Sequence, residues 1–330
     1  MKVQVARKAD ALIEAGGGGG ERTRLHLVPL DGFRTVYASC AVRAGYEGPK
    51  WERLTTKADE DEALSLRDEE ERGLLHWALA MKDGSGEKLA LALLAAGADT
   101  DATDFAGATP LHLAASHGRE AMAMALLEAG ADTNVQNKNR VTPLHRAVSN
   151  GHKALALALL AAGADKDAKD KNGAAPLHLA VSMGREAVAQ ALLAAGADKD
   201  ATNSGGYTPL HTAVQYGREA MAMALIAAGA DKDVQANGGV AKDTCGGMPL
   251  HMAAWEGHEA LARALLAAGA DKDAKDRDGD TPLHYATRKG RKAVAQALLA
   301  AGADKDAKNN RGLMPFSPGY GQLPRTIVGS

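Results

Sequence analysis

A short motif that returns at a fixed interval constrains the fold of this chain more than any other feature. Pro-Leu-His occurs six times, and each copy is preceded by Thr, Ala or Met. The prolines are Pro110, Pro143, Pro176, Pro209, Pro249 and Pro282, with spacings of 33, 33, 33, 40 and 33 residues. A seventh proline, Pro315, follows Pro282 after another 33 residues. A fixed period of this length predicts tandem copies of one structural unit rather than a single globular core.

A second motif closes each unit. Gly-Ala-Asp occurs seven times, and a Leu-Leu or Leu-Ile pair lies shortly before it. Its glycines are Gly97, Gly130, Gly163, Gly196, Gly229, Gly269 and Gly302. The two motifs therefore bracket one repeated element.

The copy that follows Asp104 shows what each position does. Thr109 suits a helix N-cap, because its hydroxyl can accept a hydrogen bond from a first-turn amide. Pro110 suits the first helical position, where a missing N–H is no loss. Gly118 can take the left-handed conformation that ends this first helix. A second helix is predicted from Arg119 to Ala129, and a polar hairpin-like loop then leads into the next copy.

Two short helices cannot bury their apolar faces alone, so the copies must stack into a continuous core. These motifs resemble ankyrin repeats over roughly residues 68–316, with about seven repeats and a partial C-terminal cap. The resemblance implies an all-α fold, an ankyrin-repeat solenoid of helix-turn-helix units joined by hairpin-like loops. In this arrangement we expect Leu160 to be buried between the helices of its own copy and the next.

Some copies depart from the pattern. Ala175 and Met248 replace the N-cap threonine, and Arg140 stands where other copies have glycine. The first recognisable copy, at Gly73-Leu74-Leu75-His76, lacks the proline. The spacing of 40 between Pro209 and Pro249 indicates an insertion of seven residues (40 − 33), which falls within residues 234–247.

Two segments lie outside the repeats. Residues 1–67 lack the period and are either a flexible segment or a stretch of degenerate repeats. Five glycines, Gly16 to Gly20, are typical of a linker, and Glu21-Arg22 follows them instead of the Lys-Ser/Thr of a phosphate-binding loop. Residues 317–330 are predicted to be an extended tail.

Composition limits the partners. The net charge of −2 gives no basic footprint for nucleic acid. Only two cysteines are present, Cys40 and Cys245, which favours a reducing compartment over a disulfide framework. The N-terminus lacks the apolar core of a signal peptide, and no run of about 18 apolar residues occurs. We therefore expect an intracellular, cytoplasmic protein that is a monomer and binds neither nucleic acid nor membrane.

The sequence offers little support for catalysis, a metal or a cofactor. Seven of the 11 histidines occupy one repeat position, and the resemblance implies that they form structural hydrogen bonds near the loops. They are His76, His112, His145, His178, His211, His251 and His284. The acidic loop from Asp273 to Gly279 does not match a calcium loop, because counting back from Gly279 places Ala274 at the first ligand position.

The resemblance implies a protein–protein interaction scaffold that binds a partner protein on its concave surface. One alternative is a targeting or regulatory subunit of an enzyme, or an enzyme fragment whose catalytic part lies outside the repeats. Another is a purely structural repeat array with no specific partner. Measuring turnover with residues 1–67 deleted, against capture of a partner by the array alone, separates the scaffold from the enzyme-related alternative.

Positions before the proline and before the inter-helix glycine are not needed for packing between the helices, so they are candidates for partner contacts. The residues that we select are Met183, Tyr207, Gln215, Tyr216, Trp255, Glu256, Arg288 and Lys289. Aromatic residues make up only 4% of the chain, yet Tyr207, Tyr216 and Trp255 fall in neighbouring copies. With Met183 they form a predicted hot spot, and Arg288 and Lys289 form a basic rim that favours an acidic partner segment. The alternative for Trp255 is that it merely covers a neighbouring helix.

Overall fold

The computed structural model describes residues 67, 70–81, 85–236, 247–318 and 322–323, which form fourteen helices and no strand. The predicted all-α fold is confirmed. The chain divides into two compact units, Met1–Asp165 and Lys166–Ser330, and each is described by itself.

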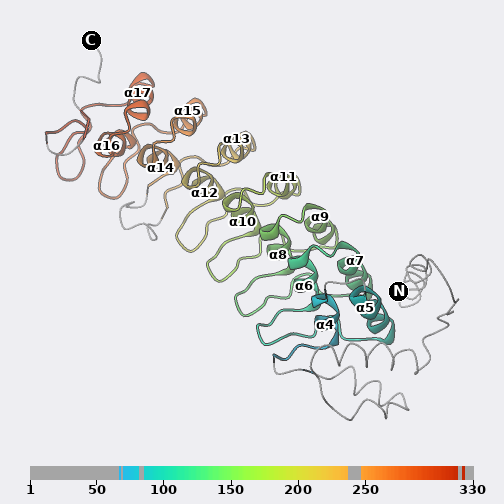
Figure 1. Ribbon diagram of the computed structural model, residues 1–330. Helices are drawn as coiled ribbons and strands as arrows, with labels where there is room; N and C mark the ends of the chain where they lie inside the picture. The colour runs from blue at the N-terminus through green and yellow to red at the C-terminus, as the bar shows by residue number, and fades with distance from the viewer. Residues whose placement is uncertain (1–66, 68–69, 82–84, 237–246, 319–321, 324–330) are drawn as a thin grey trace. The chain divides into compact units, whose positions relative to one another are not determined.

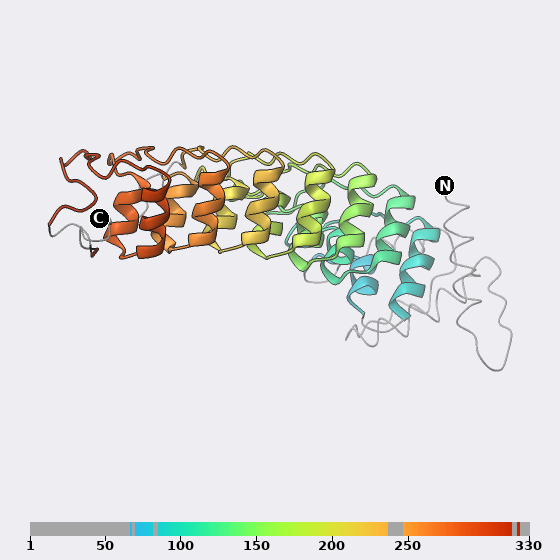
Figure 2. The same cartoon turned by 90° about the horizontal axis from the view of Figure 1, so that it is seen from above.

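Each unit is a stack of helix pairs (Figure 1). The first unit contains α4 (Leu74–Ala80), α5 (Ser85–Ala96), α6 (Pro110–His117), α7 (Glu120–Ala129), α8 (Pro143–Asn150) and α9 (Lys153–Ala161). The second contains α10 (Pro176–Ser182), α11 (Glu186–Ala194), α12 (Pro209–Gln215), α13 (Glu219–Ala227), α14 (Pro249–Glu256), α15 (Glu259–Ala267), α16 (Pro282–Arg288) and α17 (Lys292–Ala300). Within each unit, first helices pack on first helices and second helices pack on second helices (Figure 2).

The helix boundaries follow the repeated motifs. Thr109 is the N-cap of α6 and Pro110 is its first residue, as predicted. The predicted bond from a first-turn amide to the Thr109 hydroxyl is absent, because the hydroxyl lies 2.9 Å from His112 Nδ1 instead. Gly118 ends α6 with φ 66°, a left-handed conformation that glycine adopts without steric strain. Arg140, which replaces a loop glycine, takes the same kind of conformation with φ 57°.

The core of each unit is a double row of leucines. The leucine after the repeated proline is fully buried in α6, α8, α10, α12 and α16, as is one leucine of the second helix in most copies. In α9 that residue is Leu159, with 0% exposure. The prediction for Leu160 is wrong, because Leu160 is only half-buried. Neighbouring residues of a helix point about 100° apart, so the two leucines cannot share the buried face.

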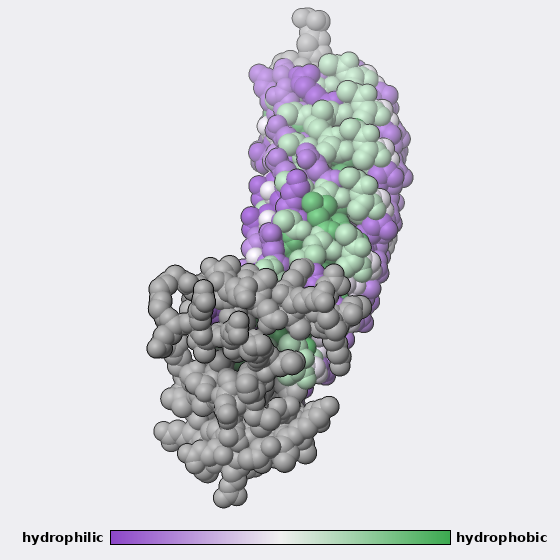
Figure 3. All heavy atoms as spheres, turned by 90° about the vertical axis from the view of Figure 1, so that its right-hand side faces the viewer, coloured by the Kyte–Doolittle hydropathy of each residue, from purple (hydrophilic) through white to green (hydrophobic). Residues whose placement is uncertain are grey.

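Small residues cover the exposed side of the second helices. Figure 3 shows an apolar band on this side, between hydrophilic margins, where the grey atoms do not cover it. The exposed residues of α13 include Ala220, Ala227 and, at 53% exposure, Met223, and the C-cap Ala228 is exposed as well. Alanine leaves little apolar side chain to cover, which fits the low aromatic content of the chain.

Aspartates join the loops that follow the second helices. The backbone N–H of Asp198 donates to Asp167 Oδ1 over 2.8 Å, and the N–H of Asp304 donates to Asp273 Oδ1 over 2.7 Å. The same bond, 31 residues apart, links Asp231 to Asp200. Lysines beside these carboxylates form exposed ion pairs, such as that of Lys272 with Asp273. The carboxylates therefore satisfy loop amides and are charge-balanced.

The insertion leaves the links around it intact. His211 Nε2 lies 3.3 Å from the carbonyl oxygen of Gly247, 36 residues on, whereas the same bond spans 29 residues from His178 to Tyr207. The Asp271-to-Asp233 bond spans 38 residues instead of 31. Both differences equal the seven inserted residues, and the N–H of Ala236 still donates to the carbonyl of Gly247. The stack on either side of the insertion is therefore undisturbed, while most of the predicted insertion (residues 237–246) lies outside the described residues.

The tail returns to the last helix pair. The N–H of Gln322 donates to the carbonyl of Thr287 over 2.9 Å, and the Gln322 side chain lies against Gly290. In earlier copies an arginine or histidine of the next repeat occupies this place, as Arg291 does beside Gly257. Gln322 thus substitutes for a contact that an eighth repeat would supply.

Replacing Leu159 by alanine tests the stacked core. We expect a loss of about 2–5 kcal/mol in the free energy of unfolding, because a fully buried leucine leaves a cavity. Leu160→Ala is the matched control and should cost clearly less, since Leu160 is half-buried. Urea denaturation followed by circular dichroism measures both. Equal costs for the two variants would contradict this assignment of the core.

Candidate partner-binding site

The repeated histidine holds the hairpin of the following repeat. His178 Nε2 lies 2.9 Å from the carbonyl oxygen of Tyr207, and His251 Nε2 lies 3.1 Å from that of Asp280. The same bond is present at His76, His112, His211 and His284. The predicted structural role near the loops is confirmed for these six residues. The bonds fix the residue two positions before each proline, where one of the candidates, Tyr207, lies.

The other ring nitrogen caps the histidine's own helix. The N–H of Thr208 donates to His211 Nδ1 over 3.2 Å, so Nε2 carries the proton that the carbonyl accepts. The Thr208 hydroxyl lies 2.8 Å from the same nitrogen and also accepts from the His211 N–H at 3.4 Å. The arrangement is a capping box in which histidine takes the place of the usual glutamate. The threonine hydroxyl therefore has the imidazole, and not only a first-turn amide, as its partner.

Burial keeps these imidazoles neutral. Removal from water lowers the pKa of His112 and of His211 from 6.5 to about 4. Burial also lowers the pKa of His178, His251 and His284. A neutral, doubly hydrogen-bonded imidazole is a fixed structural link rather than an acid–base group.

Met183 and Tyr216 are the exposed apolar candidates. They are the C-cap residues of α10 and α12 and are 53% and 54% exposed. Gln215, the last residue of α12, is exposed beside Tyr216. Because Met183 and Tyr216 occupy the same position in adjacent repeats, they lie in one row along the ends of the first helices.

Tyr207 has a different environment from Tyr216. It is half-buried in the hairpin before α12, and its ring meets that of His211 edge-on with a centroid distance of 5.7 Å. Its carbonyl accepts the bond from His178. Tyr207 therefore packs within the stack and offers only part of its ring to a partner.

Trp255, in α14, is half-buried against α16. Its ring lies 5.6 Å from that of Tyr285 in a T-shaped arrangement, and Lys289 Nζ lies 3.4 Å from the indole centroid. The guanidinium of Arg288 lies 5.7 Å from the same centroid. The alternative stated for Trp255, that it covers a neighbouring helix, describes these contacts. Glu256, next in the chain, is exposed.

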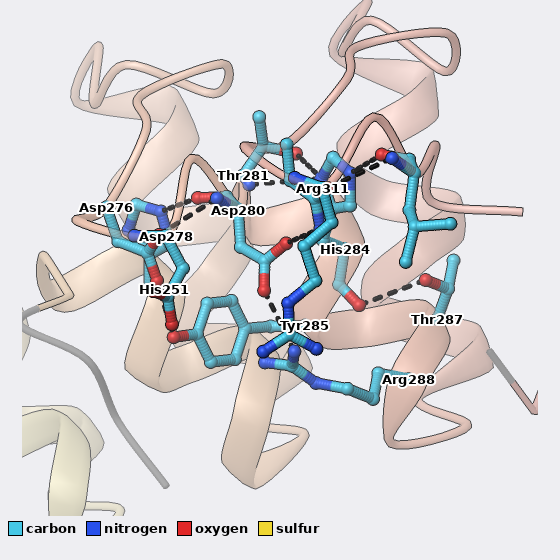
Figure 4. A network of polar contacts seen from close by, with 12 residues as sticks. His251, Asp276, Asp278, Asp280, Thr281, His284, Tyr285, Thr287, Arg288 and Arg311 are labelled. Carbon is cyan, nitrogen blue, oxygen red and sulfur yellow. Dashed lines mark hydrogen bonds and ion pairs between the residues drawn. The ribbon is translucent and has the colours of Figure 1, made fainter. Parts of the chain in front are cut away.

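A buried polar network lies beside Trp255, and the sequence analysis missed it (Figure 4). Arg288 Nη1 donates to Asp280 Oδ2 over 2.8 Å, and the Asn309 amide donates to Asp280 Oδ1 over 2.7 Å. The Tyr285 hydroxyl donates to Asp276 Oδ2 over 2.6 Å. Burial, and then this bond, raises the pKa of the tyrosine far above its usual value of 10.

The ion pair with Asp280 changes the role that was predicted for Arg288 in the basic rim. The Asp280 side chain is 4% exposed and that of Arg288 is 31% exposed, so the two charges offset each other inside the repeat. One signal was present in the sequence: Asp280 stands where other copies have Ala, Val, Tyr, Gly or Leu. A charge at a position that is otherwise neutral required a partner, and Arg288 supplies it.

The described residues lack two features that would indicate other functions. They contain no group of three or more His, Cys, Asp or Glu side chains that could hold a metal ion. None of the helices described combines the length and the apolar character needed to cross a membrane.

Comparison with known families identifies the repeat. The ankyrin-repeat family model matches residues 75–170, 154–236 and 234–309, so it covers most of the chain. The chain belongs to the ankyrin repeat family. Ankyrin repeat domains are generally protein–protein interaction modules, and their fold is typically non-catalytic.

Solved ankyrin repeat domains resemble the chain over its repeats. The ankyrin repeat domain of Bcl-3, described as a unique member of the IkappaB protein family, is 29% identical, with a TM-score of 0.61. That match covers 67% of this chain and 97% of the Bcl-3 domain. The human ASB11 ankyrin repeat domain is 30% identical, with a TM-score of 0.56, and the match covers 67% of this chain and 95% of that domain. No curated protein sequence matches the chain.

The buried histidines predict a loss of ankyrin stability in mild acid. Their folded pKa is lower than the unfolded value, so the unfolded chain binds more protons below pH 6.5. The contribution of these neutral histidines to the free energy of unfolding should be fully present above about pH 6.5 and should fall as the pH drops toward about 4. Between pH 7 and 5.5 we expect a loss of about 1 kcal/mol for each of His112 and His211.

Urea midpoints measured at pH 7 and pH 5.5 test this expectation, because carboxylates remain ionised at both values. His117→Gln, at an exposed histidine, controls for the loss of an imidazole and should keep the same pH dependence. A midpoint that does not move between the two pH values would contradict the role of burial.

The N-cap of α10 offers a stabilising substitution. Ala175 is 1% exposed and lacks the hydroxyl that Thr208 places 2.8 Å from its histidine. Ala175→Thr should therefore raise the free energy of unfolding by about 1 kcal/mol, the usual value of an N-cap. Thr208→Ala is the matched reverse change and should lower it by a similar amount. Thermal or urea unfolding measures both, and a loss in Ala175→Thr would show that the site cannot hold the hydroxyl.

Proposed function

We propose that the chain binds a partner protein through the C-terminal ends of the first helices in its second unit. The single observation that carries the proposal is the row formed by Met183 and Tyr216. Both side chains are more than half exposed, although the chain has few aromatic residues. Large exposed apolar side chains at equivalent repeat positions are costly to leave in water and suit an interface.

Trp255, next to the row position in α14, and Tyr207, in the hairpin before α12, are supported anchors near the row. Each is half-buried, with one part of the ring packed against its own repeat or the next. Rigid aromatic side chains lose little entropy when a partner covers them, so prior packing favours their use as hot spots. Gln215 and Glu256 lie beside them as exposed polar residues of the rim. We propose that this row forms part of the concave binding surface implied by the ankyrin resemblance.

A comparison of matched variants tests the proposal. Proteins from the native source are captured with three forms of the chain. These are the unmodified chain (the parent), a Met183→Ala/Tyr216→Ala double variant and a Met223→Ala variant. Met223 is the control, because it is 53% exposed but lies on the second helix α13. We expect a partner to be retained by the parent and by Met223→Ala and lost from the double variant.

Affinity for that purified partner then measures each anchor. Trp255→Ala should weaken binding by about 2 kcal/mol or more, which is about 30-fold. Circular dichroism must show an intact fold, since Trp255 also packs on α16. If the captured proteins are the same for all variants, or are lost only with Met223→Ala, the binding face lies elsewhere.

A further inference from the structure

The turn between α16 and α17 breaks the charge pattern of the second unit. In the three preceding repeats this turn ends in Gly-Arg-Glu or Gly-His-Glu, at Glu186, Glu219 and Glu259. In the last repeat it is Lys289-Gly290-Arg291-Lys292, with three cations and no carboxylate. The same turn is thus neutral or acidic in its neighbours and strongly basic here.

The three cations are held at the surface without acidic partners. Lys289 Nζ lies 3.4 Å from the centroid of the Trp255 indole ring, and Arg291 Nε donates to the Trp255 carbonyl over 3.1 Å. Arg291 and Lys292 are exposed. Across the part of the chain that the structure describes, no carboxylate oxygen lies within 4 Å of any of the three. Their charge is therefore available, whereas that of Arg288 is offset by Asp280.

Helix stability does not account for this charge. Lys292 is the first residue of α17, and the corresponding first turns of α11, α13 and α15 carry glutamate. A carboxylate is favoured at a helix N-terminus and a lysine is disfavoured there. Lys153 stands at the same position in α9, but there it is the only Lys or Arg of its turn, whereas Lys292 adds to Lys289 and Arg291. The clustering of three cations is therefore the feature that helix stability does not explain.

We infer that this cationic turn, formed by Lys289, Arg291 and Lys292, binds an acidic segment of the partner protein. The inference rests on the proposed function, because Lys289 ends the same row that contains Met183 and Tyr216. A nucleic acid or an anionic membrane fits this row less well. Glu256 lies in it between Tyr216 and Lys289, and its charge would repel a continuous polyanion.

The distance along the row from Tyr216 to Lys289 predicts the spacing of residues in the partner segment. Packed helices lie about 8–10 Å apart, so two repeat steps from Tyr216 to Lys289 span about 16–20 Å. An extended peptide rises about 3.3 Å per residue. The partner segment should therefore carry an apolar residue and, about five or six positions away, a cluster of Asp, Glu or phosphorylated residues.

Selection of peptides on the full-length chain tests the inference. Random peptides of about sixteen residues, displayed on phage, are enriched on the parent protein at physiological salt. We expect the enriched peptides to combine an acidic cluster with an apolar residue at this spacing. Their affinity should fall about tenfold on Lys289→Glu/Lys292→Glu, because two attractive rim contacts become repulsive.

Two single variants separate binding from folding. Lys292→Glu should weaken peptide binding several-fold and yet raise the urea midpoint, since it restores the favoured first-turn carboxylate. Lys153→Glu is the matched control: it makes the same change at the same repeat position, at the start of α9 in the first unit. It should leave peptide binding unchanged. Equal binding by the parent and Lys292→Glu would overturn the inference.

The remaining outcomes distinguish the two proposals. Neutral peptides that depend on Tyr216 but not on Lys292 would overturn the acidic preference and support the proposed binding face. Acidic peptides whose binding depends on Lys292 but not on Tyr216 would support the role of the cationic turn and contradict the role of Tyr216 as an anchor. Absence of enrichment, or binding that neither residue affects, would count against both. Loss of binding to phosphatidylserine vesicles or duplex DNA in Lys292→Glu, without peptide enrichment, would assign the turn to a polyanion instead.

Discussion

The two hydrogen bonds of the repeated histidine link the start of its own helix to the hairpin of the next repeat. One ring nitrogen accepts from the N-cap amide of its own helix, and the other donates to a carbonyl in the next hairpin, as His211 does between Thr208 and Gly247. Both require a neutral ring, and burial in the stack supplies that condition. Local helix initiation, the position of the following hairpin and the protonation state of the core therefore depend on one side chain. The leucine rows give the stack its free energy, while the histidine sets the register between repeats.

Much of the fold could be predicted because equivalent positions in the several copies of the repeat can be compared within one sequence. Six copies of the proline motif showed where helices begin, and the aligned glycines showed where they end. Even Arg140 could be recognised as a residue in a glycine position, and its φ of 57° agrees. Leu160 shows the limit of this approach. Periodicity identifies a leucine pair, but only the rotation of the helix decides that Leu159 is buried and Leu160 is not.

The candidate site was harder to predict, because its residues are the ones that do not repeat. The sequence placed Met183 and Tyr216 at positions without packing duty, and their exposure agrees with that argument. It could not show that Arg288 pairs with Asp280, since the two lie on different segments of one repeat and meet only through the path of the hairpin. Nor could it show that Lys289 stacks on Trp255 across the repeat boundary. Contacts between irregular positions depend on three-dimensional detail that a repeat pattern does not encode.

The seven-residue insertion between α13 and α14 shows how such a chain can change. The links on either side, from His211 to Gly247 and from Asp271 to Asp233, are formed although seven residues were added between their partners. The stacking of the repeats on either side therefore does not depend on the length of the segment between these partners. New segments can enter at this point by evolution or by loop grafting, and the array acquires a different recognition element while its scaffold stays the same.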